Sequence, residues 1–201
     1  MIRLFTKKKK IITHSGSFHA DDIFACATIA LFLDRENIPY TFLRTRDEEE
    51  MKTGDFVVDV GSIDDAETNR FDHHQQGGAG KRENGIPYAS FGLVWNKFGP
   101  LLCKEKEITE DIDRRIVQPI DAIDNGISIS EPSEAGICDY GIYGIVGAYQ
   151  NTWKEAGNIK QQHRNFVRLV NFFKDILNRE IERSFHRIEM VEVIQKVYDD
   201  A

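Results

Sequence analysis

Residues 10–35 read KIITHSGSFHADDIFACATIALFLDR. The opening Ile-Ile-Thr predicts a short buried strand that ends at His14. After a loop of small residues, apolar side chains recur at helical spacing over residues 20–35. Asp21 and Asp22 fall in the first turn of this helix, where the positive end of the helix dipole favours acids. The stretch is therefore expected to be a strand that leads into a helix.

Three more strands are expected after this helix. They cover residues 40–43, 55–60 and 69–72, and residues 47–52 form a charged linker between the first two. The stretch 55–60 is apolar almost throughout, which is typical of a strand that is covered on both faces. This order of elements indicates an α/β domain with a mostly parallel sheet flanked by helices.

Two helices are expected in the middle of the chain. The first covers residues 88–98 and ends at Gly99 and Pro100. The second covers residues 107–123, and Pro119 bends it or resets its end.

The last third of the chain has a different pattern. Glycines interrupt the apolar residues over 133–149, so we expect a mixture of helix and loop there. Over residues 158–197 apolar side chains recur at helical spacing, which predicts one long helix or two helices broken near Asn178. We therefore place a main domain at residues 1–157 and a long C-terminal helix or linker at residues 158–201.

Composition limits the class of protein. A length of 201 residues with 41% hydrophobic residues suits one folded domain with a sizeable core. The net charge of −7 argues against a general nucleic-acid coat, because such proteins bind by neutralising phosphates. The three cysteines stand singly, which fits a reducing compartment. With no bilayer-length apolar run and no signal peptide, we expect an intracellular protein of the cytoplasm, nucleus or mitochondrion.

Acids and histidines cluster where the predicted strands end. His14 and Asp59 end or nearly end their strands, and His73 and His74 follow the next one. Because ligands bind at the carboxyl ends of parallel strands, these clusters are expected to form one site. A carboxylate such as Asp59 inside an apolar run costs several kcal/mol unless it is paired or binds a metal. The alternatives are that Asp59 accepts backbone hydrogen bonds and that the other residues are caps or surface groups.

Imidazole and carboxylate together suit manganese, iron, cobalt or zinc better than magnesium alone. Two divalent ions bridged by Asp59 would activate a water for in-line attack on a phosphoryl group. Lys81 and Arg82 belong to a glycine-rich loop and could bind the substrate phosphate, although each such cation is more often a surface residue.

Five motifs resemble a known family. They are THSGSFHADD (13–22), VVDVG (57–61), RFDHHQ (70–75), NGIPYASFGLVW (84–95) and DAIDNG (121–126). Together they resemble the DHH phosphoesterase superfamily and, within it, the MYG family. That family is described as metal-dependent protein hydrolases and as 3′–5′ RNA exonucleases of nucleus and mitochondrion.

The resemblance implies roles for residues of this chain. It makes residues 1–157 a DHH-like metal-binding catalytic domain. One ion would be held by His14, His19 and Asp59, and the other by Asp21, Asp59, His73 and Asp124. His74 and Asp59 would be catalytic, with His74 facing the substrate phosphate, and Asp22, Asp72 and Asp121 would support the ligands.

Two departures from the superfamily pattern stand out. Most members have an aspartate in place of His19, so the nitrogen-rich site here favours two Mn²⁺ ions, with Mg²⁺, Zn²⁺ or Co²⁺ as alternatives. Members usually have a second, C-terminal domain that closes over the substrate, and we expect it to be absent from this chain.

The function expected from the sequence is metal-dependent phosphodiester hydrolysis by a 3′–5′ exonuclease that acts on RNA or short oligonucleotides. Two alternatives stay open, a small-molecule phosphatase or pyrophosphatase and a non-catalytic metal-binding fragment. RNA or an oligonucleotide is the expected partner, no membrane is expected, and a homodimer is compatible with the sequence.

Overall fold

A five-stranded sheet forms the centre of the protein in a computed structural model that describes residues 7–130, 134–137 and 139–200. The strand order is β2-β1-β3-β5-β4. All neighbouring pairs are parallel except the edge pair of β4 and β5. The strands are β1 (Lys9–Thr13), β2 (Tyr40–Arg44), β3 (Phe56–Val58), β4 (Asp64–Asp65) and β5 (Arg70–Phe71). The predicted α/β class with a mostly parallel sheet is confirmed.

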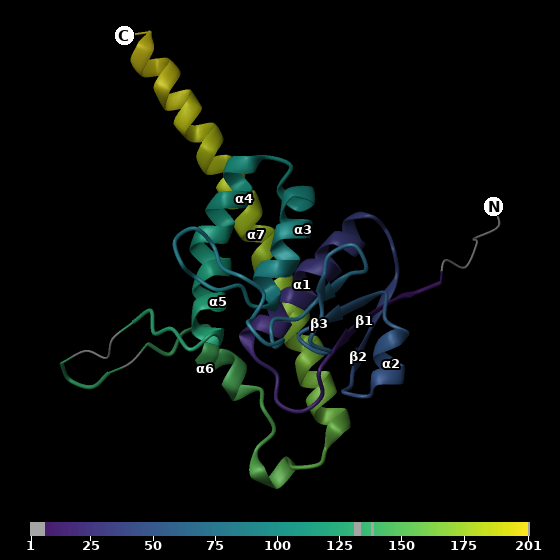
Figure 1. The fold of residues 1–201 in the computed structure, drawn as a ribbon. Helices are drawn as coiled ribbons and strands as arrows, with labels where there is room; N and C mark the ends of the chain where they lie inside the picture. Colours follow the sequence, from purple (N-terminus) through teal and green to yellow (C-terminus); the bar gives the residue numbers. More distant parts are fainter. Residues whose placement is uncertain (1–6, 131–133, 138, 201) are drawn as a thin grey trace.

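Helices flank the sheet (Figure 1). The α-helices are α1 (Ala20–Arg35), α2 (Glu48–Lys52), α3 (Ser90–Cys103), α4 (Lys106–Ile112), α5 (Gln118–Asp124), α6 (Gly141–Ala148) and α7 (Ile159–Asp199). A π-helix, η1 (Asp113–Val117), joins α4 to α5, and a short 3-10 helix, η2 (Trp153–Glu155), precedes α7.

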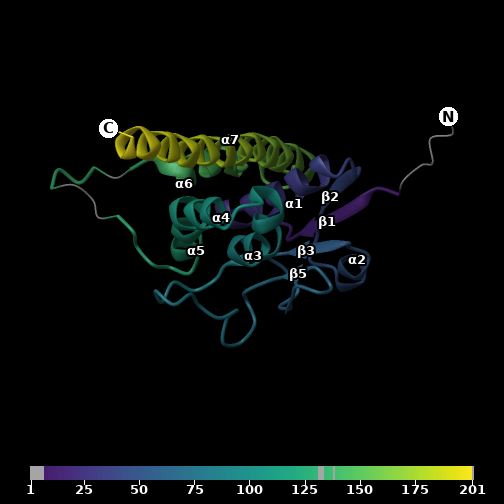
Figure 2. The ribbon, with the colours of Figure 1, turned by 90° about the horizontal axis from the view of Figure 1, so that it is seen from above.

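Helix α1 begins and ends at the predicted residues and is the centre of the main core. Nearly all of its side chains are buried, because α3 and α7 pack against it and it also contacts β1 and β3. Viewed from above, α7 forms an outer layer over α1 (Figure 2). The opposite face of the sheet buries a smaller cluster of Ile12, Val57 and Val60, against which Met51 of α2 packs. Strand β3 is thus covered on both faces, as its sequence predicted.

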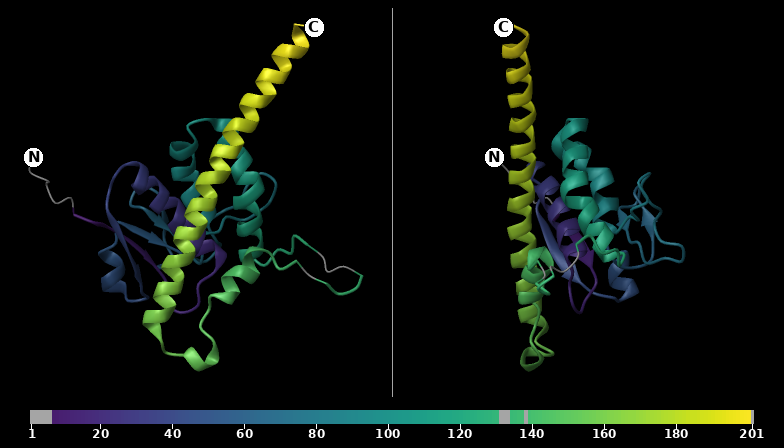
Figure 3. Two further views of the ribbon diagram at one scale, coloured as in Figure 1. Left: turned by 180° about the vertical axis from the view of Figure 1, so that it is seen from behind. Right: turned by 90° about the vertical axis from the view of Figure 1, so that its left-hand side faces the viewer.

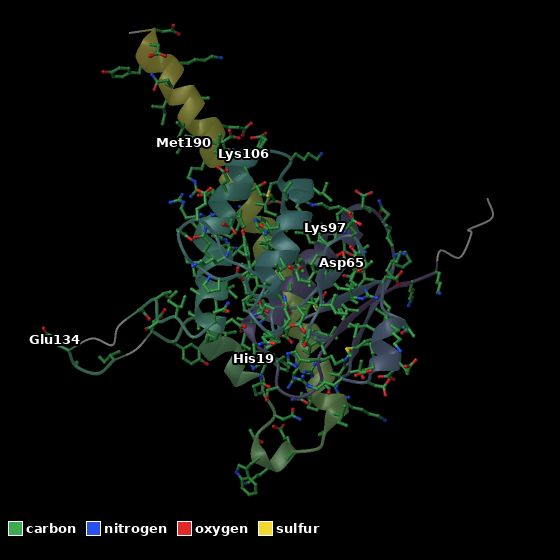
Figure 4. The ribbon with its side chains drawn as sticks, viewed as in Figure 1. His19, Asp65, Lys97, Lys106, Glu134 and Met190 are labelled. Atoms are coloured by element: carbon green, nitrogen blue, oxygen red, sulfur yellow. The ribbon has the colours of Figure 1, made fainter. Side chains whose placement is uncertain are left out.

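Helix α7 is continuous through Asn178, so the one-helix alternative is the one observed. Phe166, Leu169, Phe173 and Leu177 on its first half belong to the main core. The first half of α7 is therefore part of the same core as α1. The last part of α7 projects beyond the other helices (Figure 3), and Met190 lies exposed on it (Figure 4).

Three local expectations were wrong. Residues 47–52 are not a linker but contain α2, because the Asp47 carboxylate caps the helix by accepting from the Glu50 amide at 2.9 Å. The third strand ends at Val58 and not at residue 60. Helix α3 continues through Pro100 to Cys103, because burial of Leu102 and Cys103 stabilises its last turn.

The helix predicted over 107–123 is interrupted by the π-helix η1, which lies just before Pro119. Arg115 within η1 binds Glu180 of α7 at 2.9 Å and donates to Ser184 at 3.0 Å. These contacts fix the irregular segment to α7, which sequence spacing alone does not reveal.

The expected mixture over 133–149 contains α6, while residues 133 and 138 of that stretch lie outside the described residues. Cys26 and Cys103 are free and buried, and Cys138 is one of the residues not described. Across the described ranges, no helix combines the length and apolar character needed to cross a bilayer.

Candidate metal centre

The carboxyl edge of the sheet brings the predicted acids and histidines together. His14 follows β1, Asp59 follows β3, and His73 comes shortly after β5. His14 and Asp59 border a cleft of about 560 Å³ that is also lined by His19 and Asp124, and His73 lies 3.5 Å from Asp59. His19 lies at the start of α1, on the side of the molecule that carries α6 (Figure 4). The three strand ends therefore contribute to one site.

Asp59 leaves the strand in a left-handed conformation, with φ of 55°. Its amide still donates to the Phe71 carbonyl at 2.9 Å, so the backbone turns without losing contact with β5. Such a conformation is uncommon for a residue with a side chain and is tolerated best by Asn and Asp. The buried carboxylate lies between His14 Nε2 at 3.3 Å and His73 Nε2 at 3.5 Å. The turn thus places Asp59 between two imidazoles.

Three sets of side chains have donor atoms close enough to hold a metal ion. They are His14 with His19 and Asp59, Asp59 with His73 and His74, and Asp21 with His73 and Asp124. Within each set the donor atoms lie within 4.8 Å of one another. Asp59 is shared by the first two sets and His73 by the last two. These groups could bind a metal ion.

His73 supports this interpretation most directly. Its buried Nε2 lies 3.2 Å from Asp124 and 3.5 Å from Asp59, yet neither contact has hydrogen-bond geometry. Burial alone would lower the pKa of His73, but the carboxylates of Asp124 and Asp59 outweigh it and raise the pKa to about 10. His73 Nε2 thus lies between two carboxylates, an arrangement of donor atoms that a divalent cation could also use.

The His14 imidazole is also oriented toward Asp59. Its Nδ1 lies 3.1 Å from the Ser15 carbonyl, to which it donates, and its Nε2 faces Asp59 at 3.3 Å. Burial would lower the pKa of His14, but Asp59 and Asp22 outweigh it and the pKa is raised. Burial alone would raise the pKa of Asp59, but the imidazoles of His14 and His73 outweigh it and hold that pKa down.

Asp22 lies closer to the site than a supporting position requires. One oxygen accepts from the His19 amide at 2.8 Å, while the other has no hydrogen-bond partner and lies 3.4 Å from His14 Nε2. Burial raises the pKa of Asp22 to about 7 despite the nearby His14. By distance, Asp22 is as well placed beside His14 as Asp59 is.

Asp21 has a second role in the fold. Its two oxygens accept from the amides of Ser90 and Phe91 at 3.1 and 2.7 Å, at the positive end of α3. Burial, together with the charges of Asp59 and Asp124, raises the pKa of Asp21 well above its usual range. Asp21 thus fixes the start of α3 to α1 while it lies in the third donor set.

Asp121 and Arg82 form a buried ion pair beside this helix end. The Arg82 guanidinium binds Asp121 at 2.7 Å and Asp113 at 2.8 Å, and Asp121 also accepts from the Gly92 amide. Burial raises the pKa of Asp121 to about 7, even though Arg82 acts to lower it. Neither Arg82 nor the exposed Lys81 lines the cleft. The structure therefore gives Arg82 two carboxylate partners within the protein.

His74 is the most exposed imidazole of the Asp-His-His motif and lines the cleft. Asp72 accepts from its Nδ1 at 2.7 Å, and also accepts from the amides of Ser62 and His74. These bonds fix the ring and leave its Nε2 available to the cleft.

Arg46 lines the cleft and was missed by the sequence analysis. It follows β2, and its Nε donates to the Ser15 carbonyl at 3.4 Å. Its position just after a parallel strand was the available signal, since that is where ligand-binding residues gather. Tyr143 of α6 also lines the cleft and donates to the Ile120 carbonyl at 3.1 Å.

Comparison with known proteins gives the chain a family. Residues 10–201 match the model MYG1_exonuc, described as an uncharacterised protein family (UPF0160). The MYG1 protein of Chlamydia muridarum is 30% identical over 193 residues, covering 95% of this chain and 60% of the relative. The human MYG1 exonuclease is 34% identical over 137 residues, covering 59% of this chain and 36% of the relative. No solved structure matches the chain significantly.

The matched region is only part of each of these relatives, since the chain spans 60% of the chlamydial protein's length and 36% of the human one's. The family match nevertheless covers every residue of the candidate metal centre, from His14 to Asp124. This chain belongs to the MYG1_exonuc family, UPF0160.

Proposed function

We propose that this chain is the metal-binding part of a phosphodiester hydrolase of the DHH type, which shortens RNA or short oligonucleotides from the 3′ end. The observation that carries the proposal is the overlap of three donor sets on Asp59 and His73. Adjacent metal sites that share a carboxylate suit phosphoryl transfer. The exonuclease name of the mammalian relatives supports the choice of a nucleic-acid substrate.

The donor chemistry fits divalent ions. The first two sets each have two imidazoles and one carboxylate, and the third has one imidazole and two carboxylates, a mixture that suits Mn²⁺. Two such ions would supply an activated water and would neutralise charge on the phosphoryl oxygens. Because His73 is protonated at neutral pH in the metal-free chain, binding should release a proton and strengthen as the pH rises.

The chain's own groups supply the rest of the chemistry. His74, held by Asp72 through Nδ1, presents Nε2 to the cleft, where the ring in its imidazolium form would donate a hydrogen bond to a phosphoryl oxygen. Arg46 adds a positive charge to the cleft wall and is suited to bind a second oxygen of the same group. Asp59, whose pKa is lowered, stays ionised between His14 and His73 at neutral pH.

Asp59→Asn tests the proposal. After chelation and addition of Mn²⁺, the wild type should shorten a 5′-labelled single-stranded RNA stepwise, and the variant should not. Asp55→Asn is the matched control, because Asp55 immediately precedes the same strand, bonds Lys9, and lies outside the cleft. Melting temperatures with and without Mn²⁺ report binding separately, since a ligand of the native state stabilises it.

Pyrophosphate run beside the RNA decides between substrates. Turnover of pyrophosphate without RNA shortening would mean that the chain is a small-molecule phosphatase. Stabilisation by Mn²⁺ with no turnover of either substrate would mean that it only holds metal. Full RNA cleavage by Asp59→Asn would refute the proposal that two metal sites share the Asp59 carboxylate.

A further inference from the structure

A second hollow, of about 720 Å³, adjoins the metal centre. We call it the basic groove and define it by the side chains of Arg44, Lys160, His163 and Arg164, which line it together with the loop at Ser15 and Gly16. Arg44 ends β2, and the other three lie in the first two turns of α7. The start of α7 and the loop between β1 and α1 lie on the same side of the molecule (Figures 1 and 3).

One loop separates the basic groove from the metal-centre cleft. Ser15 lines the groove, while its carbonyl lies 3.1 Å from His14 Nδ1 and accepts from Arg46 Nε, and both of those side chains line the cleft. Arg44 and Arg46 are two residues apart at the end of β2, one on each side of this loop. A chain that enters the cleft can therefore continue into the groove.

The cations of the groove have no carboxylate within ion-pair distance among the described residues. Within the described part of the chain, Arg44, Lys160 and Arg164 have no ion pair with a carboxylate: Arg44 binds the Gly16 carbonyl, and Arg164 binds Gln161. Residues 159–168 include three lysines and arginines and no acid, although the whole chain has a net charge of −7. The start of α7 is thus a basic segment within an acidic chain.

Lys160 and Arg164 destabilise the start of α7 when no ligand is bound. Lys160 lies in the first turn of α7, at the positive end of the helix dipole, where a cation is unfavourable. Lys160 and Arg164 are four residues apart on the helix, and like charges at that spacing repel each other. An arrangement that costs local stability without a partner inside the protein is expected where a ligand supplies the opposite charge.

The lining of the groove favours a nucleic-acid strand over a single anion. Phe42, Leu43 and Ile159 provide apolar surface beside the cations. Sites for single-stranded nucleic acid combine a positive track for the backbone with surfaces on which bases pack. Arg44 is held in place between Phe18 and Phe166, with ring centroids at 5.2 and 4.9 Å, so its charge is fixed at the groove wall.

From these observations we propose that the basic groove binds the phosphates of a single-stranded oligonucleotide whose end lies in the metal-centre cleft. This assignment rests on the proposed function and extends it, since it places the nucleotides beyond the scissile bond along β2 and the start of α7. Lys160 and Arg164 each contact one backbone phosphate, and Arg44 holds the strand where it passes the Ser15 loop.

The test is binding of a fluorescent 12-nucleotide oligouridylate by anisotropy, with excess chelator so that no turnover occurs. The variant Lys160→Gln/Arg164→Gln removes two charges and keeps good helix formers. Each lost phosphate contact should reduce the slope of log K against log salt by about 0.7, and hence by about 1.4 for both. Extrapolated from 1 M salt, this corresponds to an affinity loss of about 25-fold at 0.1 M.

Arg179→Gln/Arg183→Gln is the matched control. It removes the same charge at the same spacing from the same helix, at side chains that are about two-thirds exposed or more and lie outside the groove. The control should bind the oligonucleotide as the wild type does, and circular dichroism should show both variants folded.

Three results would overturn the assignment. They are binding by Lys160→Gln/Arg164→Gln within twofold of the wild type, no salt-dependent binding by the wild type, and equal affinity for inorganic polyphosphate of the same charge. Because the assay excludes metal, its outcome is separate from catalysis. Salt-dependent binding through the groove without RNA shortening in Mn²⁺ would refute the proposed function and leave the groove assignment standing.

Discussion

Replacing Arg82 with methionine should lower the free energy of unfolding, because it would leave the buried carboxylate of Asp121 without its partner. The Arg82 side chain is 8% exposed and lies 2.7 Å from Asp121, which is fully buried. Breaking such a pair by removing one partner costs about 3–5 kcal/mol. For a domain of this size, that lowers the melting temperature by roughly 6–20 °C.

Urea unfolding followed by circular dichroism measures this loss. Arg114→Met is the matched control, since Arg114 is 73% exposed and its pair with Asp111 should contribute below about 1 kcal/mol. A loss for Arg82→Met as small as the control's would refute the buried-pair reasoning. Unchanged stability with lost RNA binding would instead restore Arg82 as a substrate-binding residue.

Two further predictions concern packing and pH. Gly92→Ala should destabilise the protein by about 2 kcal/mol or more, because a Cβ there would lie 2.0 Å from an Asp121 oxygen. In Gly147→Ala the new Cβ meets nothing within 4 Å, so this helical substitution should stabilise by about 0.5–1 kcal/mol. Burial would raise the pKa of Asp111, but Ser184 and Arg115 outweigh it and the pKa is lowered. The stability that wild type has over Asp111→Asn should therefore be complete above about pH 4 and disappear as the pH falls through the lowered pKa.

Thermal melts of the two glycine variants, run together, check the packing prediction, and equal shifts of one sign would contradict it. Urea unfolding of wild type and Asp111→Asn from pH 2 to pH 7 checks the pH prediction. A difference between the two proteins that grows as the pH falls would contradict the assigned ion pairs.

The sequence predicted correctly those helices and strands that are determined by neighbouring residues in the chain. Helix α1 begins and ends where its apolar spacing and first-turn acids indicated, and β1 lies within one residue of its prediction. Helix α2 was missed because its cap, Asp47, stands in a run of charges that resembles a linker. The continuation of α3 past Pro100 depends on burial against other elements, which sequence spacing does not show.

The part of the candidate site that lies at the ends of parallel strands could be predicted from the sequence. Parallel strands carry His14, Asp59 and His73 to one edge, so their proximity could be inferred from three apolar runs. The partners of Arg82 could not, because Asp113 and Asp121 lie 31 and 39 residues away and depend on how η1 leads into α5. The unpaired oxygen of Asp22 depends on side-chain orientation alone.

The π-helix η1 sets the rotation of α5 about the helix axis relative to α4. A π-turn holds one residue more than an α-turn, and one residue corresponds to about 100° of rotation and 1.5 Å of rise. Helix α4 can therefore keep its face against α7 while α5 directs Asp121 at Arg82 and Asp124 at His73. If one residue were deleted from η1, either α4 would lose its packing against α7 or α5 would turn Asp121 and Asp124 away from their partners. The extra residue of η1 therefore lets α4 and α5 take independent orientations about a shared axis.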